Sequence, residues 1–259
     1  MFEDLAGLMD VTQAGLSAFV LVFVRVGAVM ALLPGFGERI IPARVRLAAT
    51  FAFTMIVFPL LAEELIQVDP ARPFHLLLLI EAAVGFLIGV SIRLMVFAIQ
   101  LAGSIAAQST ALAQIFGAGA TPDPMPAIGN ILMLAGVTLA VTAGLHIKAA
   151  LAMAQSYEIL PFGMILSGSD VATWGTAHVA DAFALGFSLA APFVIAAFAY
   201  NIALGAINKA MPSLMVAFVG APAITAGGIL ILMLAAPVIL HFWNARLDFV
   251  LLNPLGMPR

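Results

Sequence analysis

Charge is scarce in this sequence, and cysteine is absent. Asp, Glu, Lys and Arg make up only 9% of the 259 residues, against about 25% in soluble proteins. The formal net charge of −3 is scattered and includes no basic run, which excludes an electrostatic surface for nucleic acid. Without cysteine the chain has no disulfides and no thiolate metal sites, and its redox compartment stays undetermined.

Apolar residues take the place of the missing charge. The chain is 64% hydrophobic, with a mean hydropathy of +1.17, and it holds several runs near the roughly 20 residues that cross a bilayer as a helix. Runs such as "GGILILMLAAPVIL" are apolar on every side, unlike the alternating strands of a membrane barrel. We therefore predict an all-α integral membrane protein, a single domain over 1–259. Its six apolar segments cover about 14–33, 47–62, 74–99, 128–145, 182–207 and 214–240.

The charges between these segments indicate an orientation. The first connection, 34–46, is rich in arginine, whereas the second holds mainly acids. Because Lys and Arg accumulate on the cytoplasmic side, we expect 34–46 inside and 146–181 outside. This assignment leaves Lys148, Arg246 and Arg259 on the unexpected side. The acidic start "MFEDLAGLMD" lacks the basic region of a cleavable signal peptide, so we expect the first span to direct insertion.

Four charged residues lie within or beside the apolar segments. They are Arg25, Glu81, Arg93 and Lys209. A charge in a span is costly unless it finds a partner, reaches the interface or faces a polar cavity. For Arg25 and Glu81 interhelical pairing is favoured over a transport role. For Arg93 and Lys209, snorkelling at a helix end is as good an interpretation as a functional one.

Two polar stripes recur at helical spacing. Gln100, Ser104 and Gln108 are four residues apart, and Asn201, Gly205, Asn208 and Lys209 share one face of a later segment. Such faces leave amides unsatisfied if they point at lipid. They predict either hydrogen bonding between helices or one wall of a hydrophilic conduit.

Glycine and proline suggest close packing and irregular helices. Gly85 and Gly89 form a G-x-x-x-G pattern that permits helices to approach closely, although the pattern is common in so glycine-rich a chain. Five prolines are expected to interrupt or bound helices because each lacks a backbone donor: Pro59, Pro192, Pro212, Pro222 and Pro237.

Catalytic patterns are lacking. The four histidines show no metal-binding spacing, and no nucleotide-binding loop is present. We therefore expect no enzymatic activity, no catalytic residues, no cofactor and no metal.

Three stretches carry a family resemblance. They are "FVLVFVRVGAVMALLPGFGERIIPARVRLAAT" (19–50), "GLHIKAALAMAQSYEILPFG" (144–163) and "ALGFSLAAPFVIAAFAYNIALGAINKAMPSLMVAFVGAP" (184–222). Together they resemble the FliR family of flagellar export proteins, whose injectisome relatives are called SctT. The sequence of the third stretch resembles the flagellar members of the family more than the injectisome members.

The resemblance implies a gate for protein export. FliR-like proteins join FliP and FliQ, with FlhB and FlhA nearby, in the inner membrane at the flagellar basal body. Unfolded flagellar proteins pass through this assembly, whose apolar helices pack as tilted hairpins around a channel. An injectisome gate subunit, a small-molecule secondary transporter and a purely structural membrane scaffold are the alternatives.

The resemblance also implies a channel plug in the loop after the third apolar segment, at "AQIFGAGATPDPMPAIGN" (113–130). Glycines allow unusual backbone shapes there, prolines stiffen the chain, and no Lys or Arg is present. The expected plug covers 116–126, with these residues: Phe116, Gly117, Ala118, Gly119, Ala120, Thr121, Pro122, Asp123, Pro124 and Met125.

Overall fold

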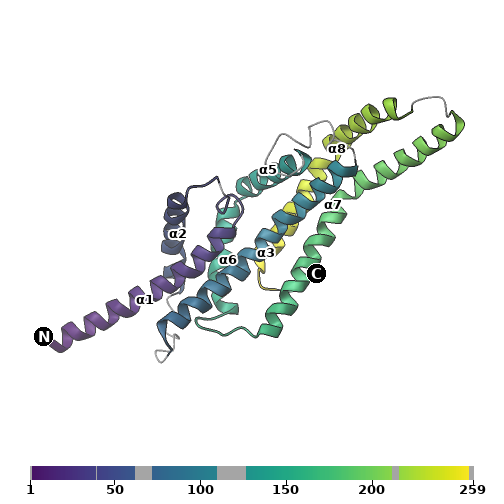
Figure 1. The fold of residues 1–259 in the computed structure, drawn as a ribbon. Coiled ribbons are helices and arrows are strands. Elements are labelled where there is room, and N and C mark those ends of the chain that lie inside the picture. The colour runs from purple at the N-terminus through teal and green to yellow at the C-terminus, as the bar shows by residue number, and fades with distance from the viewer. Residues whose placement is uncertain (1, 39, 62–71, 110–126, 212–215, 257–259) are drawn as a thin grey trace. The chain divides into compact units, whose positions relative to one another are not determined.

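The chain is mainly helical in the part that its structure, a computed structural model, describes. This part comprises residues 2–38, 40–61, 72–109, 127–211 and 216–256, and for 2–14, 208 and 216–222 the backbone alone. The helices are α1 (Phe2–Leu32), α2 (Ala43–Val57), the 3-10 turn η1 (Phe58–Leu61), α3 (Phe74–Ser109), α5 (Ala127–Thr142), α6 (Leu145–Ile159), α7 (Gly168–Ala210) and α8 (Val216–Leu252) (Figure 1). The described residues include no strand. The predicted all-α membrane class is confirmed.

Five stretches of helix are long and apolar enough to cross a membrane: Gly15–Leu32, Ala43–Leu61, Phe74–Ser109, Gly168–Ile207 and Ala223–Leu252. The helices α5 and α6 form a sixth such element that is bent by 73°. The bend lies at Gly144, whose φ of 85° is in the left-handed region that glycine adopts without strain. The chain is therefore a multi-pass membrane protein, and the bent pair in its described part has the form of either a broken span or a re-entrant loop.

Several helices extend well beyond the apolar segments seen in the sequence. The helix α3 continues to Ser109, α7 begins at Gly168 and α8 ends at Leu252, whereas the corresponding apolar segments end near 99, begin near 182 and end near 240. Hydropathy reports where apolar sequence stops, but a helix continues through polar residues as long as its backbone hydrogen bonds are made. The apolar segments therefore mark the interior of these helices and not their ends.

The prolines disturb the helices less than the sequence predicts. Pro192 lies inside α7, and Pro222 and Pro237 lie inside α8, where the helix continues on both sides. A proline removes one hydrogen bond from a ladder, and helices of 43 and 37 residues retain the rest. Pro59 lies in η1, directly after α2, and Pro212 lies outside the described residues.

The helices form two compact units. Unit 1 contains Met1–Arg93, Ala143–Ala177 and Asp248–Arg259, and unit 2 contains Leu94–Thr142 and His178–Leu247. Each unit thus combines parts of the chain that are far apart in sequence. Each has its own core.

In unit 1 the glycine pair on α3 packs against α1. A Cβ at Gly85 would overlap the carbonyl oxygen of Arg25 and lie 2.9 Å from the Cβ of Ala28. A Cβ at Gly89 would come within 2.9 Å of the Leu32 side chain. The G-x-x-x-G pattern is therefore a close helix crossing in this chain.

In unit 2 a tryptophan and two glycines organise the core. The indole nitrogen of Trp243 on α8 donates to the Met95 carbonyl oxygen of α3 at 2.6 Å, and the side chain is fully buried. Gly103 on α3 meets Gly129 on α5 so closely that a Cβ at Gly103 would overlap the Gly129 Cα. Small residues thus bring α3 and α5 into backbone contact.

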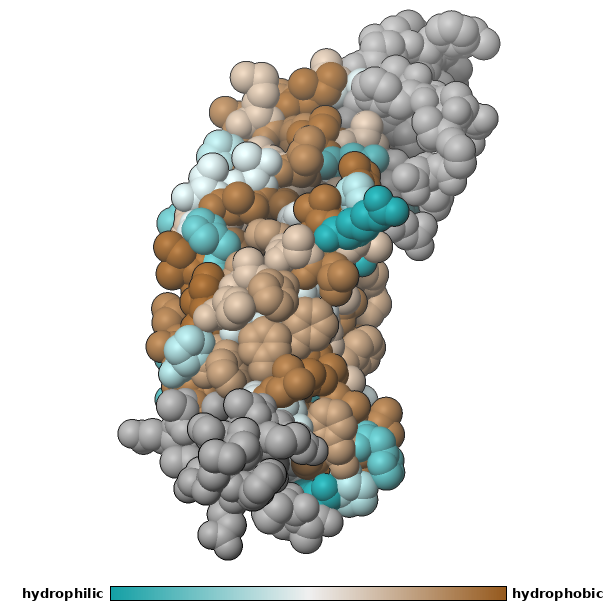
Figure 2. Space-filling model, turned by 90° about the vertical axis from the view of Figure 1, so that its left-hand side faces the viewer, coloured by the Kyte–Doolittle hydropathy of each residue, from teal (hydrophilic) through white to brown (hydrophobic). Residues whose placement is uncertain are grey.

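Large apolar side chains remain exposed on much of the surface. In the candidate spans, 56% of α3 is buried, against 33% of α7 and 11% of α8. Hydrophobic side chains occupy much of the face shown in Figure 2. Lipid or other polypeptides must cover these helices in the cell, because so much apolar surface is unstable in water.

Candidate functional site

A buried ion pair lies at the centre of unit 1. The Arg25 Nε on α1 donates to the Glu81 Oε2 on α3 at 2.6 Å, and neither side chain has any exposed surface. The sequence predicts interhelical partners for both residues, and the structure pairs them with each other. Each charge neutralises the other where neither could be hydrated.

The rest of the Arg25 guanidinium binds α6 and the segment that follows it. Its Nη1 donates to the Ser156 Oγ at 3.2 Å, and its Nη2 donates to the Leu160 carbonyl oxygen at 3.0 Å. The guanidinium also lies 3.7 Å from the centre of the Tyr157 ring, a favourable cation–π distance. Arginine suits this position because its planar group offers several donors at once.

The second carboxylate oxygen of Glu81 accepts a hydrogen bond from the segment that follows α6. The Gly163 backbone N–H donates to the Glu81 Oε1 at 3.2 Å. Gly163 has a φ of 70°, so glycine meets a conformational demand there, and the Arg72 guanidinium donates to its carbonyl oxygen. We call Arg25, Glu81, Ser156, Tyr157, Leu160 and Gly163 the Arg25 cluster; it joins α1, α3 and α6 to the turn after α6.

Sequence reasoning missed the second half of this cluster. Ser156 and Gly163 are separated from Arg25 by more than 130 residues, and nothing in local spacing connects them. The available signal is the motif Leu-Pro-x-Gly at 160–163, which directly follows the end of α6, where Ser156 and Tyr157 lie.

Three further ion pairs in the described part of the chain are partly exposed. Arg93 Nη1 lies 2.6 Å from Glu38 Oε1, so Arg93 has a partner in the turn after α1. Two further pairs, Lys148 with Asp248 and Arg246 with Asp181, also have N–O distances of 2.6 Å. Lys148 and Arg246 are two of the three cations that the expected orientation places on the unexpected side, and each is paired with an aspartate. The third, Arg259, lies outside the described residues.

The two polar stripes have different surroundings. On α3 the half-buried Gln100 donates to the Met133 sulfur on α5 at 2.7 Å, and Ser104 donates to the Leu101 carbonyl oxygen of its own helix at 2.8 Å. Gln108 is exposed. Only Gln100 therefore uses its side chain to join two helices.

On α7 the described members of the second stripe, Asn201, Gly205 and Lys209, are all exposed. The side chain of Asn208 is outside the described part. The structure thus places a polar strip on the surface of an apolar helix.

The expected plug, Phe116 to Met125, lies outside the described residues. Its flanking helices are described: α3 ends at Ser109, α5 begins at Ala127, and the two are in backbone contact at Gly103 and Gly129. The segment 110–126 therefore leaves and rejoins a closely packed helix pair. Among the described residues no group of three or more His, Cys, Asp or Glu side chains could hold a metal ion.

Comparison with known proteins gives a consistent result. The sequence profile of a family described as bacterial export proteins, family 1, matches residues 16–250. A protein of Caulobacter vibrioides named flagellar biosynthetic protein FliR is 31% identical over 231 residues, which cover 87% of this chain and 91% of the relative. Proteins of the same name from Aquifex aeolicus and Bacillus subtilis are 27% and 26% identical, and each match covers 86% of this chain and 87% of the relative.

Proposed function

The chain belongs to the FliR family of bacterial export proteins, and we propose that it is a channel subunit of the flagellar type III protein export apparatus. In this proposal it assembles with FliP- and FliQ-type proteins, near FlhB and FlhA, in the bacterial inner membrane at the flagellar basal body. Unfolded flagellar proteins leave the cytoplasm through the resulting gate. The subunit has no enzymatic role and takes its driving energy from partners.

The observation that carries this proposal is the exposure of amides on apolar helices. Gln108 on α3 and Asn201 on α7 are both exposed, and both belong to candidate spans. Hydrocarbon offers no hydrogen bonds, so an amide on a membrane helix needs another polypeptide or water. A conduit for a hydrated, unfolded chain supplies both.

The surface of α7 supports assembly with other subunits. Only 33% of its candidate span, Gly168–Ile207, is buried, and this span is longer than the roughly 20 residues that cross the hydrocarbon core. The part that extends beyond the core is suited to contact with water or other polypeptides.

The segment 116–126 is the proposed closing element. Its base is the contact between Gly103 and Gly129, which holds the two flanking helices together. Its only charge is Asp123, so it offers little to bind a passing polypeptide. A short glycine- and proline-containing segment with Phe116 and Met125 is suited to fill a narrow pore.

The alternatives have less support. All three relatives compared above carry flagellar names, which favours the flagellar over the injectisome apparatus. In a secondary transporter, ionisable residues within the spans often mark the transport pathway. Arg25 and Glu81, the two charges that the sequence offers for that role, bind each other and are fully buried. Solute uptake by the purified chain in liposomes would favour the secondary transporter over the export gate.

A deletion and complementation experiment tests the function. In the source bacterium, loss of the gene should abolish secretion of filament protein, and the wild-type gene should restore it. A variant lacking 117–124 should assemble but make the membrane permeable to ions. The matched variant Asp123→Asn keeps the length of the segment and should keep the membrane closed. Normal secretion without the gene would refute the proposal, and unchanged permeability without 117–124 would refute the closing element alone.

A further inference from the structure

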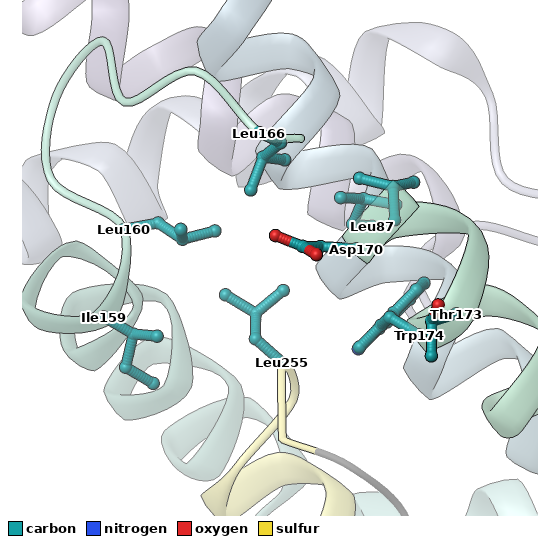
Figure 3. Close-up of a pocket in the computed structure, with 9 residues that line it drawn as sticks. Leu87, Ile159, Leu160, Leu166, Asp170, Thr173, Trp174 and Leu255 are labelled. Carbon is teal, nitrogen blue, oxygen red and sulfur yellow. The ribbon is translucent and has the colours of Figure 1, made fainter. Parts of the chain in front are cut away.

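A cavity in unit 1 has no role in the arrangement described so far. Its volume is about 370 Å³, within the range of small-ligand sites. Four leucines from four parts of the chain form most of the wall shown in Figure 3: Leu87 of α3, Leu160 after α6, Leu166 before α7 and Leu255 after α8. The cavity is apolar and is assembled by the tertiary fold.

One carboxylate projects into this apolar space. Asp170, in the first turn of α7, extends between Leu160, Leu166 and Leu255 (Figure 3). Its side chain is exposed, and it has no hydrogen bond or ion pair with any residue in the described part of the chain. An acid in this turn also complements the helix dipole, but that role needs no cavity around it.

The lining indicates the chemistry of a ligand. Asp170 attracts a cation, and Trp174, one helical turn further along α7, also lines the cavity and offers an aromatic ring to a cation. The leucines suit an apolar stem. Among the described residues the lining contains no Lys or Arg, so the phosphate of a lipid headgroup would find no counter-charge in this part of the wall and would be repelled by Asp170.

We propose that the cavity receives a lysine side chain of a neighbouring membrane polypeptide. The butyl stem would lie against the leucines, and the ammonium group would lie between the Asp170 carboxylate and the Trp174 ring. Exposure of Asp170 and Thr173 at the rim gives access from outside. This proposal holds whether or not the chain lines a channel.

The Arg25 cluster fixes one wall of the cavity before a ligand binds. The Leu160 carbonyl oxygen accepts a hydrogen bond from the Arg25 Nη2 at 3.0 Å, and the Leu160 side chain forms one wall of the cavity. A site with fixed walls binds without the entropic cost of ordering them. The buried ion pair therefore has a second consequence, which is to position a docking surface.

The absence of cysteine allows a direct chemical test. Thr173→Cys places the only thiol of the chain at the cavity rim, and a short thiol-to-amine cross-linker is then applied to native membranes of the source organism. We expect an adduct between position 173 and a lysine of another polypeptide, identified by mass spectrometry. In an added Asp170→Asn background the yield should fall about tenfold, the effect of losing one charge-assisted hydrogen bond.

Two controls make the outcome decisive. Asp170→Glu retains the charge and should retain most of the adduct, and both variants are compared for membrane level and protease resistance. Ala172→Cys is exposed on the same helix but does not line the cavity, and it should give little adduct. Adducts only with amine lipids or with this chain's own amines, equal yields from positions 172 and 173, no adduct, or no effect of Asp170→Asn would each overturn the proposal.

Discussion

Polar groups have opposite surroundings in two regions of the molecule. One region is the Arg25 cluster of unit 1, and the other is the exposed strip on α7 of unit 2, formed by Asn201, Gly205 and Lys209. Arg25 and Glu81 are fully buried, and protein groups occupy both oxygens of Glu81 and all three nitrogens of Arg25. On α7, Asn201 and Lys209 are exposed on a helix whose apolar stretch is only one-third buried. The first region satisfies the charges of Arg25 and Glu81 within the chain, whereas the second depends on its surroundings.

From this difference we expect the Arg25 cluster to determine the stability of the chain and the exposed strip to determine its assembly with other molecules. Substitutions in the Arg25 cluster should change the free energy of unfolding of the chain itself. Substitutions on the exposed strip should leave that free energy almost unchanged and should instead alter contacts with other molecules. Each prediction below tests one side of this division.

The largest effect is expected from breaking the buried ion pair. Arg25→Ala or Glu81→Ala leaves one buried charge without its partner, and each should lower the free energy of unfolding by about 3–5 kcal/mol. Denaturant unfolding of the purified protein in detergent measures this change. The double variant Arg25→Met with Glu81→Leu should lose less, about 1–3 kcal/mol, because only neutral hydrogen-bonding groups lose their partners.

A matched control for this prediction is the pair between Lys148 and Asp248, whose side chains are about one-third exposed. Lys148→Met should cost less than Arg25→Ala, because Asp248 is not enclosed by the protein and its side chain can move when its partner is lost. If Lys148→Met and Arg25→Ala cost the same, the buried cluster has no special part in the stability of unit 1.

A medium effect is expected at the crossing of α3 and α5. Gly103→Ala forces a methyl group onto the Gly129 backbone and should cost about 1–3 kcal/mol, typical of overpacking. Gly129→Ala is the matched variant, because its Cβ would meet its nearest neighbour at an ordinary 3.5 Å and should be tolerated. Thermal unfolding of the two variants measures the difference, and equal melting temperatures would contradict the close crossing.

The smallest effect on stability is expected on the surface of α7. Phe198 is 68% exposed and lies three residues before Asn201, on the same side of the helix. Phe198→Ser should change the free energy of unfolding by less than about 0.5 kcal/mol, yet it should reduce co-purification with FliP- and FliQ-type proteins. Phe193→Ala, at a fully buried position in the same helix, should instead destabilise the chain by about 3–5 kcal/mol.

An unstable Phe198→Ser protein would contradict the assignment of this surface to partner contacts. Normal co-purification together with normal stability would indicate that lipid alone covers Phe198.

The sequence predicts the membrane class and the need of Arg25 and Glu81 for partners, because both follow from the cost of polar groups in hydrocarbon. It does not predict that Ser156 and Gly163 complete the cluster, since that contact depends on how α6 and the turn after it pack against α1 and α3. The sequence does not predict the start of α7 either, for a simpler reason. Asp170, His178 and Asp181 lower the hydropathy of 168–181 without interrupting the helix.

The channel role of the exposed strip can be tested with a flagellar export substrate that is stalled in transit by a tightly folded fusion. The substrate carries one cysteine, and the present chain carries one at Asn201, or at Ile195 as the control. Ile195 is 66% exposed but is turned about 120° away from Asn201 around α7. A thiol-to-thiol cross-linker should join the stalled substrate to position 201 and not to position 195. Absence of the adduct at 201, or equal adducts at both positions, would contradict a conduit along this face.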